Sequence, residues 1–280
     1  MLNPSKPLDN FPLVRTTNPD KMRETLARVY AEPTLRFARG AKTLNARLNE
    51  CRLQETVLAF GKYGGAVCLD FPAVDSFVHF LSLRGNAEIT SKHQTASVTS
   101  AAAGVTISPD AGYQANYTPD YEGLLLKFDA AALTRKLVAM TGATINEPLR
   151  MSLQSNSKRV ASTLRQYVPM LADTLSEAVA PLPSWWVAQT EQLLMVMFFC
   201  ENQHNYSHLL EGDAPDPAPW QVRKAEEYIE ANWRQAITLE DLAEVAGVSA
   251  FRLFRAFKKI RGYSPLEFAS QVRCKSKGNN

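Results

Sequence analysis

The strongest chemical signal in the sequence is a group of cationic and aromatic side chains near its C-terminal end. Residues 249–280 hold eight basic residues and one acidic residue, so this end should attract an anionic partner. Arginine presents a fork of N–H donors that fits guanine O6 and N7, and an apolar side chain can contact a thymine methyl group. These residue types predict contacts with double-stranded DNA from Phe251, Arg252, Phe254, Arg255, Lys258 and Lys259.

On a helix, Phe251, Arg255 and Lys258 follow each other at spacings of four and three residues, and Phe254 lies three beyond Phe251. They would therefore share one exposed stripe. We expect Phe251, Phe254 and Arg255 to face bases. Arg252, Lys258 and Lys259 are expected near phosphates, where contacts add affinity without reading sequence. The alternative is a basic, solvated helix on a small helical domain.

Three short helices must position this stripe. The first is predicted over Trp220–Trp233, with Trp233 on its inner face. The second begins at Thr238, where Thr238 and Asp241 are spaced for a capping box, and ends at Gly247. Ser249 is placed to cap the third helix, residues 250–261. Its inner face is predicted to hold Leu253, Ala256, Phe257 and Ile260.

Residues 238–258 closely resemble the first helix-turn-helix of AraC/XylS-type transcription regulators. The family pattern has Leu, Leu, Ala and Ala on the inner face, Gly at the turn, and Ser, Leu, Arg and Phe along the recognition helix. In this sequence these positions are Leu239, Leu242, Ala243, Ala246, Gly247, Ser249, Leu253, Arg255 and Phe257. Residues 262–268 resemble the Gly-x-Ser-Pro start of the family's connecting helix. The resemblance implies sequence-specific DNA binding in the major groove.

Family members carry a second helix-turn-helix after the connecting helix. Here the helical pattern runs to Arg273, and residues 274–280 lack core-forming periodicity. The sequence therefore resembles a regulator that lacks the second helix-turn-helix. It would be a truncated product, an excised piece or a natural short variant. Loss of one helix-turn-helix should weaken specific DNA binding. The alternative function is a ligand-binding and dimerising protein that acts through full-length partners.

Upstream, the sequence divides into segments that differ in hydrophobic periodicity and in turn signals. Residues 1–128 are rich in period-two alternation and turn signals, which predicts a β-sandwich or barrel. Residues 129–210 have helical periodicity, with helices expected over 129–140, 157–179 and 184–209. Residues 211–219 hold three prolines in five positions and read as a linker to residues 220–280. The predicted fold class is α+β.

The resemblance adds roles to these segments. The family layout implies a cupin-like sensor domain for residues 1–128, a small-molecule effector, and dimerisation through residues 129–210. RNA polymerase would be a further partner. A barrel interior has room for one small molecule, and its aromatic candidates are Phe60, Phe71, Phe77, Phe80 and Tyr113. The simpler interpretation of these five side chains is that they only fill the core.

Other chemistry finds little support in the sequence. His79 and His93 are isolated, and His204 and His208 share a helix face with no further ligand cluster, so neither a metal nor a cofactor is predicted. No phosphate-binding glycine loop and no nucleophile elbow is present, so we do not expect an enzyme. The four cysteines form no CxxC pair, and no segment reads as a signal peptide or membrane span, which predicts a cytoplasmic protein.

Overall fold

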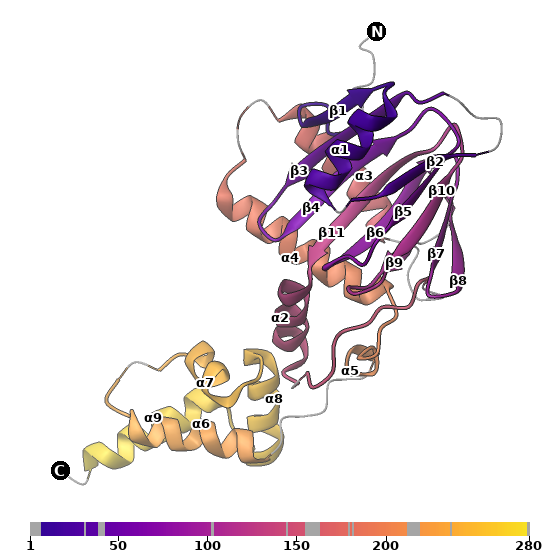
Figure 1. Ribbon diagram of the computed structural model, residues 1–280. Coiled ribbons are helices and arrows are strands. Elements are labelled where there is room, and N and C mark those ends of the chain that lie inside the picture. The colour runs from indigo at the N-terminus through magenta and orange to yellow at the C-terminus, as the bar shows by residue number, and fades with distance from the viewer. Residues whose placement is uncertain are drawn as a thin grey trace. The chain divides into compact units, whose positions relative to one another are not determined.

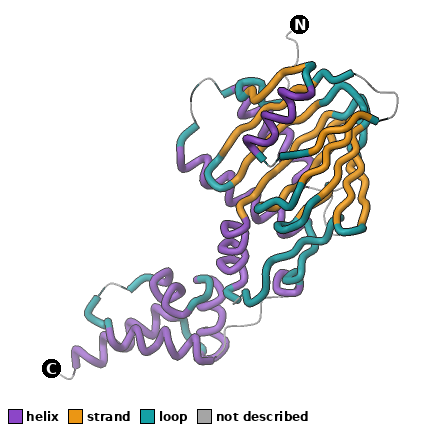
Figure 2. The backbone as a smooth tube through the Cα atoms, in the orientation of Figure 1, coloured by secondary structure: helices purple, strands orange, loops and turns teal. Residues whose placement is uncertain are grey.

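A computed structural model of the chain describes residues 7–30, 32–38, 43–101, 104–143, 145–154, 163–178, 180, 182–211, 219–235 and 237–278, with the backbone alone at residues 211, 219, 251 and 276–278. It divides into two compact units. Unit 1 comprises residues 1–134 and 147–205, and unit 2 comprises residues 135–146 and 206–280. Unit 1 holds the strands and unit 2 is helical (Figures 1 and 2). Within the described ranges, no helix has the length and apolar character to cross a membrane.

Unit 1 is built on two facing antiparallel sheets. One has the strand order β1 (Pro12–Thr16), β3 (Ala46–Arg52), β4 (Thr56–Lys62), β11 (Glu122–Asp129), β6 (Ser76–Arg84) and β9 (Val105–Ile107). The other has the order β2 (Thr34–Phe37), β5 (Val67–Phe71), β10 (Tyr113–Tyr117), β7 (Ala87–Ser91) and β8 (Gln94–Val98). The predicted α+β class with a β-rich N-terminal domain is confirmed.

Strand alternation explains how the core between the sheets forms. On β10, Tyr113, Ala115 and Tyr117 point inward and are buried, while the residues between them are half-exposed. On β6, Val78 and Phe80 join the same core. The sequence analysis missed α1 (Pro19–Val29), which Asn18 caps by accepting a hydrogen bond from the Asp20 amide at 2.8 Å.

The outer face of the six-stranded sheet is also apolar, and helices cover it. Between the residues of β6 that point inward, Phe77 and His79 point outward and contact the ring of Phe198 on α4 (Ser184–Glu201). Phe128 from β11 packs on the same ring, with centroids 4.7 Å apart. α3 (Thr163–Glu177) packs beside α4. It contains Pro169 and is not broken there.

Polar side chains tie these two helices to the β-sheets. The buried Glu191 carboxylate accepts a hydrogen bond from the Glu55 amide at 2.8 Å. Ser176 Oγ accepts one from the Leu8 amide at 2.7 Å. Each bond joins α3 or α4 to a segment far away in the sequence. The helices are therefore part of unit 1, and the predicted division at residues 128 and 129 does not coincide with the boundary of a compact unit.

The helix bounds in residues 129–211 differ in part from expectation. α2 (Ala130–Thr141) begins as predicted, because the Asp129 carboxylate accepts from the Ala132 amide at 2.8 Å. α4 ends at Glu201 rather than continuing to residue 209, since Asn202 adopts an extended backbone, and α5 (His208–Glu211) is a separate turn. Residues 212–218, the main part of the predicted linker, lie outside the described residues.

Unit 2 contains α6 (Pro219–Ala231), α7 (Leu239–Ala246), α8 (Ala250–Arg261) and α9 (Pro265–Gly278). Its core is formed by the predicted apolar faces, including the fully buried Val222, Leu242, Leu253 and Phe257. Two predicted members differ. Trp233 follows the end of α6 and is only half-buried, and Ile260 is 38% exposed on α8. α9 also continues past Arg273, where the sequence pattern was expected to stop.

Burial of His79 predicts a loss of stability in acid. Desolvation lowers the pKa of His79 from 6.5 to about 4, so below pH 6.5 the unfolded chain binds a proton that the folded chain rejects. The free energy of unfolding should therefore fall by about 2 kcal/mol between pH 7 and pH 5 from this group alone. Urea unfolding at the two pH values measures this. His79→Gln should lose less stability over this interval, whereas the exposed His93→Gln should match the wild type.

Gly247 should not tolerate a β-branched side chain, because its backbone is in the left-handed conformation. Its φ is +66°, and an added Cβ would meet no atom within 4 Å, so crowding is absent and only the left-handed conformation matters. We expect Gly247→Val to cost about 1–2 kcal/mol, and Gly247→Asn to cost less because asparagine tolerates this conformation. Urea unfolding followed by circular dichroism measures both, and equal costs for the two variants would contradict the explanation.

Candidate functional site

The turn between α7 and α8 presents the predicted DNA-contacting residues. At the start of α7, Thr238 and Asp241 form the predicted capping box, with bonds of 3.2 and 2.9 Å between side chain and backbone. Gly247 closes α7 in the left-handed conformation. Ser249 then caps α8 by accepting from the Arg252 amide at 3.4 Å. The two helices are thereby held by local bonds at both sides of a three-residue connection, residues 247–249.

α8 separates apolar and cationic side chains cleanly. Leu253, Ala256 and Phe257 are fully buried against the other helices of unit 2. The opposite side carries Arg255, Lys258 and Lys259, all of which are exposed. Phe254 is half-buried, and the Lys258 ammonium lies 5.3 Å from its ring centroid. The side chain of Phe251 lies outside the described residues.

Arg252 has a different position from the one expected of a phosphate contact. It is half-buried, and its guanidinium donates a hydrogen bond to the backbone carbonyl of Thr141, the last residue of α2. Gly142 follows with φ +66°, and a Cβ there would come within 3.2 Å of the Gly247 carbonyl oxygen. In unit 2, the end of α2 therefore packs against the α7–α8 turn, and Arg252 helps to hold it there.

Arg261, at the end of α8, anchors the helix to α6. Its Nε and Nη2 atoms donate to the two carboxylate oxygens of Glu226, each at 2.7 Å. These hydrogen bonds with Glu226 raise the pKa of Arg261 above its ordinary value. The bidentate pair joins the C-terminal end of α8 to α6.

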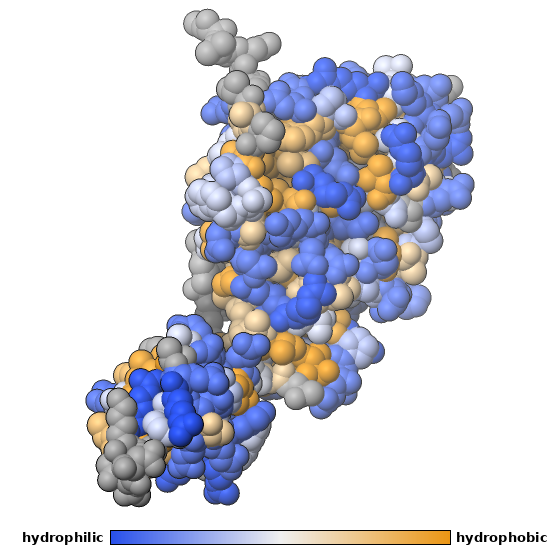
Figure 3. All heavy atoms as spheres, turned by 90° about the vertical axis from the view of Figure 1, so that its left-hand side faces the viewer, coloured by the Kyte–Doolittle hydropathy of each residue, from blue (hydrophilic) through white to orange (hydrophobic). Residues whose placement is uncertain are grey.

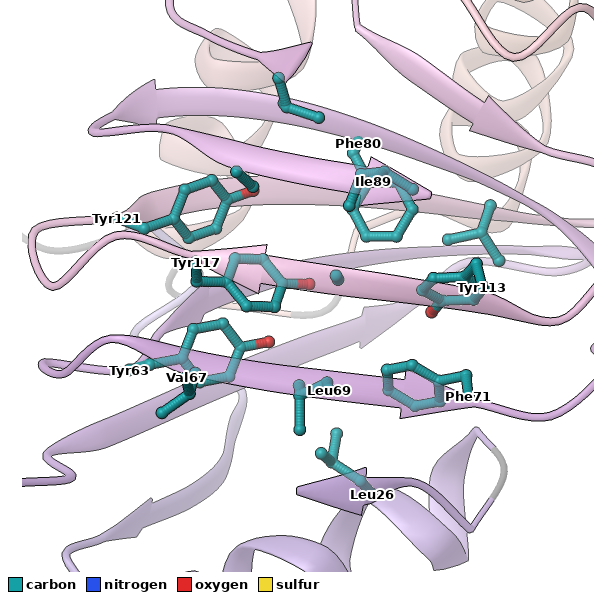
Figure 4. Close-up of a cluster of buried hydrophobic side chains, with 14 of the residues drawn as sticks. Leu26, Tyr63, Val67, Leu69, Phe71, Phe80, Ile89, Tyr113, Tyr117 and Tyr121 are labelled. Carbon is teal, nitrogen blue, oxygen red and sulfur yellow. The ribbon is translucent and has the colours of Figure 1, made fainter. Parts of the chain in front are cut away.

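A second candidate site is a cavity between the two sheets of unit 1. Tyrosine and phenylalanine rings form much of its wall (Figure 4). Tyr63, Tyr117 and Tyr121 form one group, with centroids 4.4 Å apart for Tyr63 and Tyr117 and 4.8 Å apart for Tyr117 and Tyr121. Phe71 and Tyr113 stack at 4.9 Å. Leu26 and Tyr30 of the α1 segment also line the cavity.

The five predicted ligand-lining residues separate into two sets. Phe71, Phe80 and Tyr113 line the cavity and belong to its surrounding core. Phe60 also lines the cavity. It does so although it pairs with Asn49 and Leu124 at a register position that faces away from the other sheet. Phe77 lies on the helix-covered face against Phe198 and away from the cavity, because it is one residue out of phase with Phe80.

Sequence reasoning missed Tyr30, Tyr63, Tyr117 and Tyr121. The alternation of Tyr113, Ala115 and Tyr117 carried a signal for Tyr117, since it places both rings on the same face of one strand. Tyr30, Tyr63 and Tyr121 lie at an element end or in turns, where no period applies.

The described residues contain no group of three or more His, Cys, Asp and Glu side chains arranged to hold a metal ion. His79 is instead part of a buried hydrogen-bonded chain. Its Nδ1 lies 2.9 Å from Thr106 Oγ1, which in turn donates to Asn202 Oδ1 at 3.1 Å. All four cysteines are free thiols. Neither group forms a catalytic arrangement.

Comparisons with known proteins place these features in a family. Residues 22–198 match the AraC-binding-like domain. The bifunctional transcriptional activator/DNA repair enzyme AdaA of Bacillus subtilis (strain 168) is 43% identical over 47 residues, which is 17% of this chain and 22% of AdaA. The chain thus matches about a fifth of that relative's length.

A solved structure extends the likeness in fold. The AraC-like transcriptional activator CuxR superposes with a TM-score of 0.50 at 16% identity, over 94% of this chain and 95% of that chain. The resemblance to AraC-type regulators is therefore confirmed at the level of family and fold. Since the domain match covers more than half of its residues, the chain belongs to the AraC-binding-like domain family.

Proposed function

We propose that the protein is a transcription regulator that binds double-stranded DNA through α7 and α8 and responds to a small-molecule effector held between the sheets of unit 1. The observation that carries this proposal is the exposed basic side of α8, presented by a helix-turn-helix arrangement with capped helices. Membership in the AraC-binding-like domain family supports it. The protein acts by binding rather than by catalysis.

The side chains of α8 differ in the DNA groups that they are suited to contact. Arg255 offers a donor fork for a guanine edge, and Phe254 offers an apolar surface for a thymine methyl group. Lys258 and Lys259 neutralise phosphates, which makes part of the affinity dependent on salt and independent of sequence. Arg252 contributes through the position of the turn, because its guanidinium already binds the Thr141 carbonyl. We keep Phe251 as a proposed base contact because its spacing places it on the same stripe as Arg255.

The outward side of α4 supports a homodimer. Trp185, Gln189, Leu193 and Cys200 follow a helical stripe, and Trp185 and Leu193 are 67% and 42% exposed. Helix α4 begins at the left of unit 1 in Figure 1 and runs below the sheets. Figure 3 shows the face of the molecule on that left-hand side, where hydrophobic residues lie among hydrophilic ones. An exposed apolar stripe of this kind marks a contact surface. Pairing two chains through it would present two reading helices to one DNA site and raise their effective concentration.

The same stripe favours a second candidate function. A chain that dimerises well and reads DNA weakly would regulate through mixed dimers with full-length partners. RNA polymerase is a further proposed partner of the regulator. Selection of bound fragments from a random DNA library by the purified chain, at low and at physiological salt, separates the two functions. A motif that survives physiological salt supports the regulator, whereas binding at low salt without a motif supports the second candidate.

Replacing Arg255 tests the proposed base contact. Arg255→Ala should cost about 1–3 kcal/mol on the selected site and relax the preference at one base position. Lys259→Ala is the matched control. It should weaken binding to all sequences alike and reduce the salt dependence of affinity, with the site preference unchanged. Fluorescence anisotropy titrations with the selected and scrambled duplexes measure both. An unchanged base preference in Arg255→Ala would remove this residue from the proposed readout.

A change on α4 tests the proposed dimer. The wild-type chain should elute at twice its mass of 31.1 kDa, and Trp185→Lys with Leu193→Lys should elute at the mass of one chain, since two buried charges oppose pairing. Size exclusion with light scattering gives the masses. The control is Trp220→Lys on α6, which replaces an equally exposed apolar side chain, 59% exposed, and should leave the dimer intact. A monomeric wild type refutes the dimer.

A further inference from the structure

The cavity between the sheets has a wall of unusual chemistry. Among the described residues that line it, five are tyrosines and none of the others carries a charge: Leu26, Leu48, Ala59, Phe60, Gly61, Phe71, Phe80, Gly123, Leu124 and Leu125. A buried hydroxyl must replace its hydrogen bonds with water. Tyr30 does so with Glu50, and Tyr63 and Tyr117 bond with each other. Phenylalanine would fill these positions without that requirement. The hydroxyls therefore indicate a site that offers hydrogen bonds to a molecule inside it.

The rings hold three of these hydroxyls in a common direction. Figure 4 shows the hydroxyls of Tyr63, Tyr117 and Tyr121 pointing to the same side, toward the part of the cavity bounded by Phe71, Phe80 and Tyr113. The ring faces of the three tyrosines pack against each other. The group thus presents oxygen atoms and ring edges to the cavity, and Tyr63 also forms a hydrogen bond with Tyr117.

Opposite the tyrosine group, the wall consists largely of aromatic carbon. Phe71 stacks on Tyr113 with the ring planes 22° apart, and Phe80 contacts Tyr113 edge to face at 5.6 Å. A molecule in the cavity would therefore find hydrogen-bonding groups at one end and carbon surfaces at the other.

Among the residues of the wall that the structure describes, none carries a charge that would compensate an ion in the cavity. Burial raises the pKa of Tyr63 to about 12 and the pKa of Tyr113, Tyr117 and Tyr121 still further, so the hydroxyls are neutral donors and acceptors at physiological pH. The charged neighbours lie at Tyr30: the Glu50 carboxylate interacts with its hydroxyl, and Lys127 Nζ is 5.8 Å from its ring. Lys127 is itself paired with Asp75 at 3.8 Å, and neither Glu50 nor Lys127 is among the residues that line the wall, so an ion in the cavity would be buried without a partner of its own.

We infer that this cavity takes a small, uncharged molecule with one hydrogen-bonding head group and an apolar body, and that it discriminates against anions and cations of the same shape. This inference rests on the proposed function, since it specifies the chemical class of the effector. The head group would bind among the hydroxyls of Tyr63, Tyr117 and Tyr121, and the body would lie against Phe71, Phe80 and Tyr113.

Two matched series of probes test the charge preference on the full chain. Acetamide, acetate and acetamidinium have one small shape, and benzamide, benzoate and benzamidinium have one larger shape, while the charge is zero, negative or positive. The neutral member of at least one series should raise the melting temperature, with affinity at least tenfold above its charged analogues, because an unpaired buried charge is costly. Isothermal titration gives the dissociation constants. Equal or tighter binding of a charged member, or no binding of either neutral probe, overturns the inference.

A pair of variants locates the binding. Tyr117→Phe keeps the ring and removes one hydroxyl from the tyrosine group, so the affinity for the neutral probe should fall about three- to tenfold. Tyr167→Phe on α3 removes a hydroxyl away from the cavity wall and should leave the affinity unchanged. Equal affinities for wild type and Tyr117→Phe would overturn the assignment of the head group to these hydroxyls.

DNA affinity measured with the probe separates this inference from the proposed function. A neutral probe that binds in the cavity without changing DNA affinity supports the ligand class and counts against an effector response. A charged analogue that binds in the cavity and changes DNA affinity refutes the ligand class and leaves the regulator in place.

Discussion

The six-stranded sheet of unit 1 has two apolar faces, and the rest of this unit follows from the need to cover both. One face is buried against the five-stranded sheet. The other receives Phe198 of α4, whose ring contacts Phe77, His79 and Phe128 from neighbouring strands. Because α4 must supply this contact, its buried side is determined by the sheet. Its opposite side is left with Trp185 and Leu193 exposed.

Unit 2 depends on local rules more than on long-range packing. Thr238, Ser249 and Ser264 each begin a helix with a side-chain bond to the backbone, and Gly247 and Gly262 each end one in the left-handed conformation. These signals act over three or four residues, so they specify helix ends before any tertiary contact forms. The bidentate bond between Arg261 and Glu226 then fixes one helix against another.

This difference explains what the sequence made predictable. Bounds of α7 and α8 follow from caps that lie next to the helices, and they were predicted to within a residue. Period-two alternation predicted the β domain, but it could not tell that Phe77 faces a helix while Phe80 faces the cavity, since both faces of that strand are apolar. The position of Arg252 depends on Thr141, which lies 111 residues earlier, and no spacing in the sequence brings these two together.

The tyrosines of the cavity show how a core reveals a use beyond folding. Phenylalanine would fill the positions of Tyr63, Tyr117 and Tyr121 with nearly the same ring, and it would avoid burying a hydroxyl. A sequence that satisfied only the fold would not need these oxygens, and departures of this kind are expected at functional sites. The hydroxyls share one direction, which packing alone does not require. Their cost to the fold is offset when a bound molecule accepts or donates the hydrogen bonds that water no longer provides.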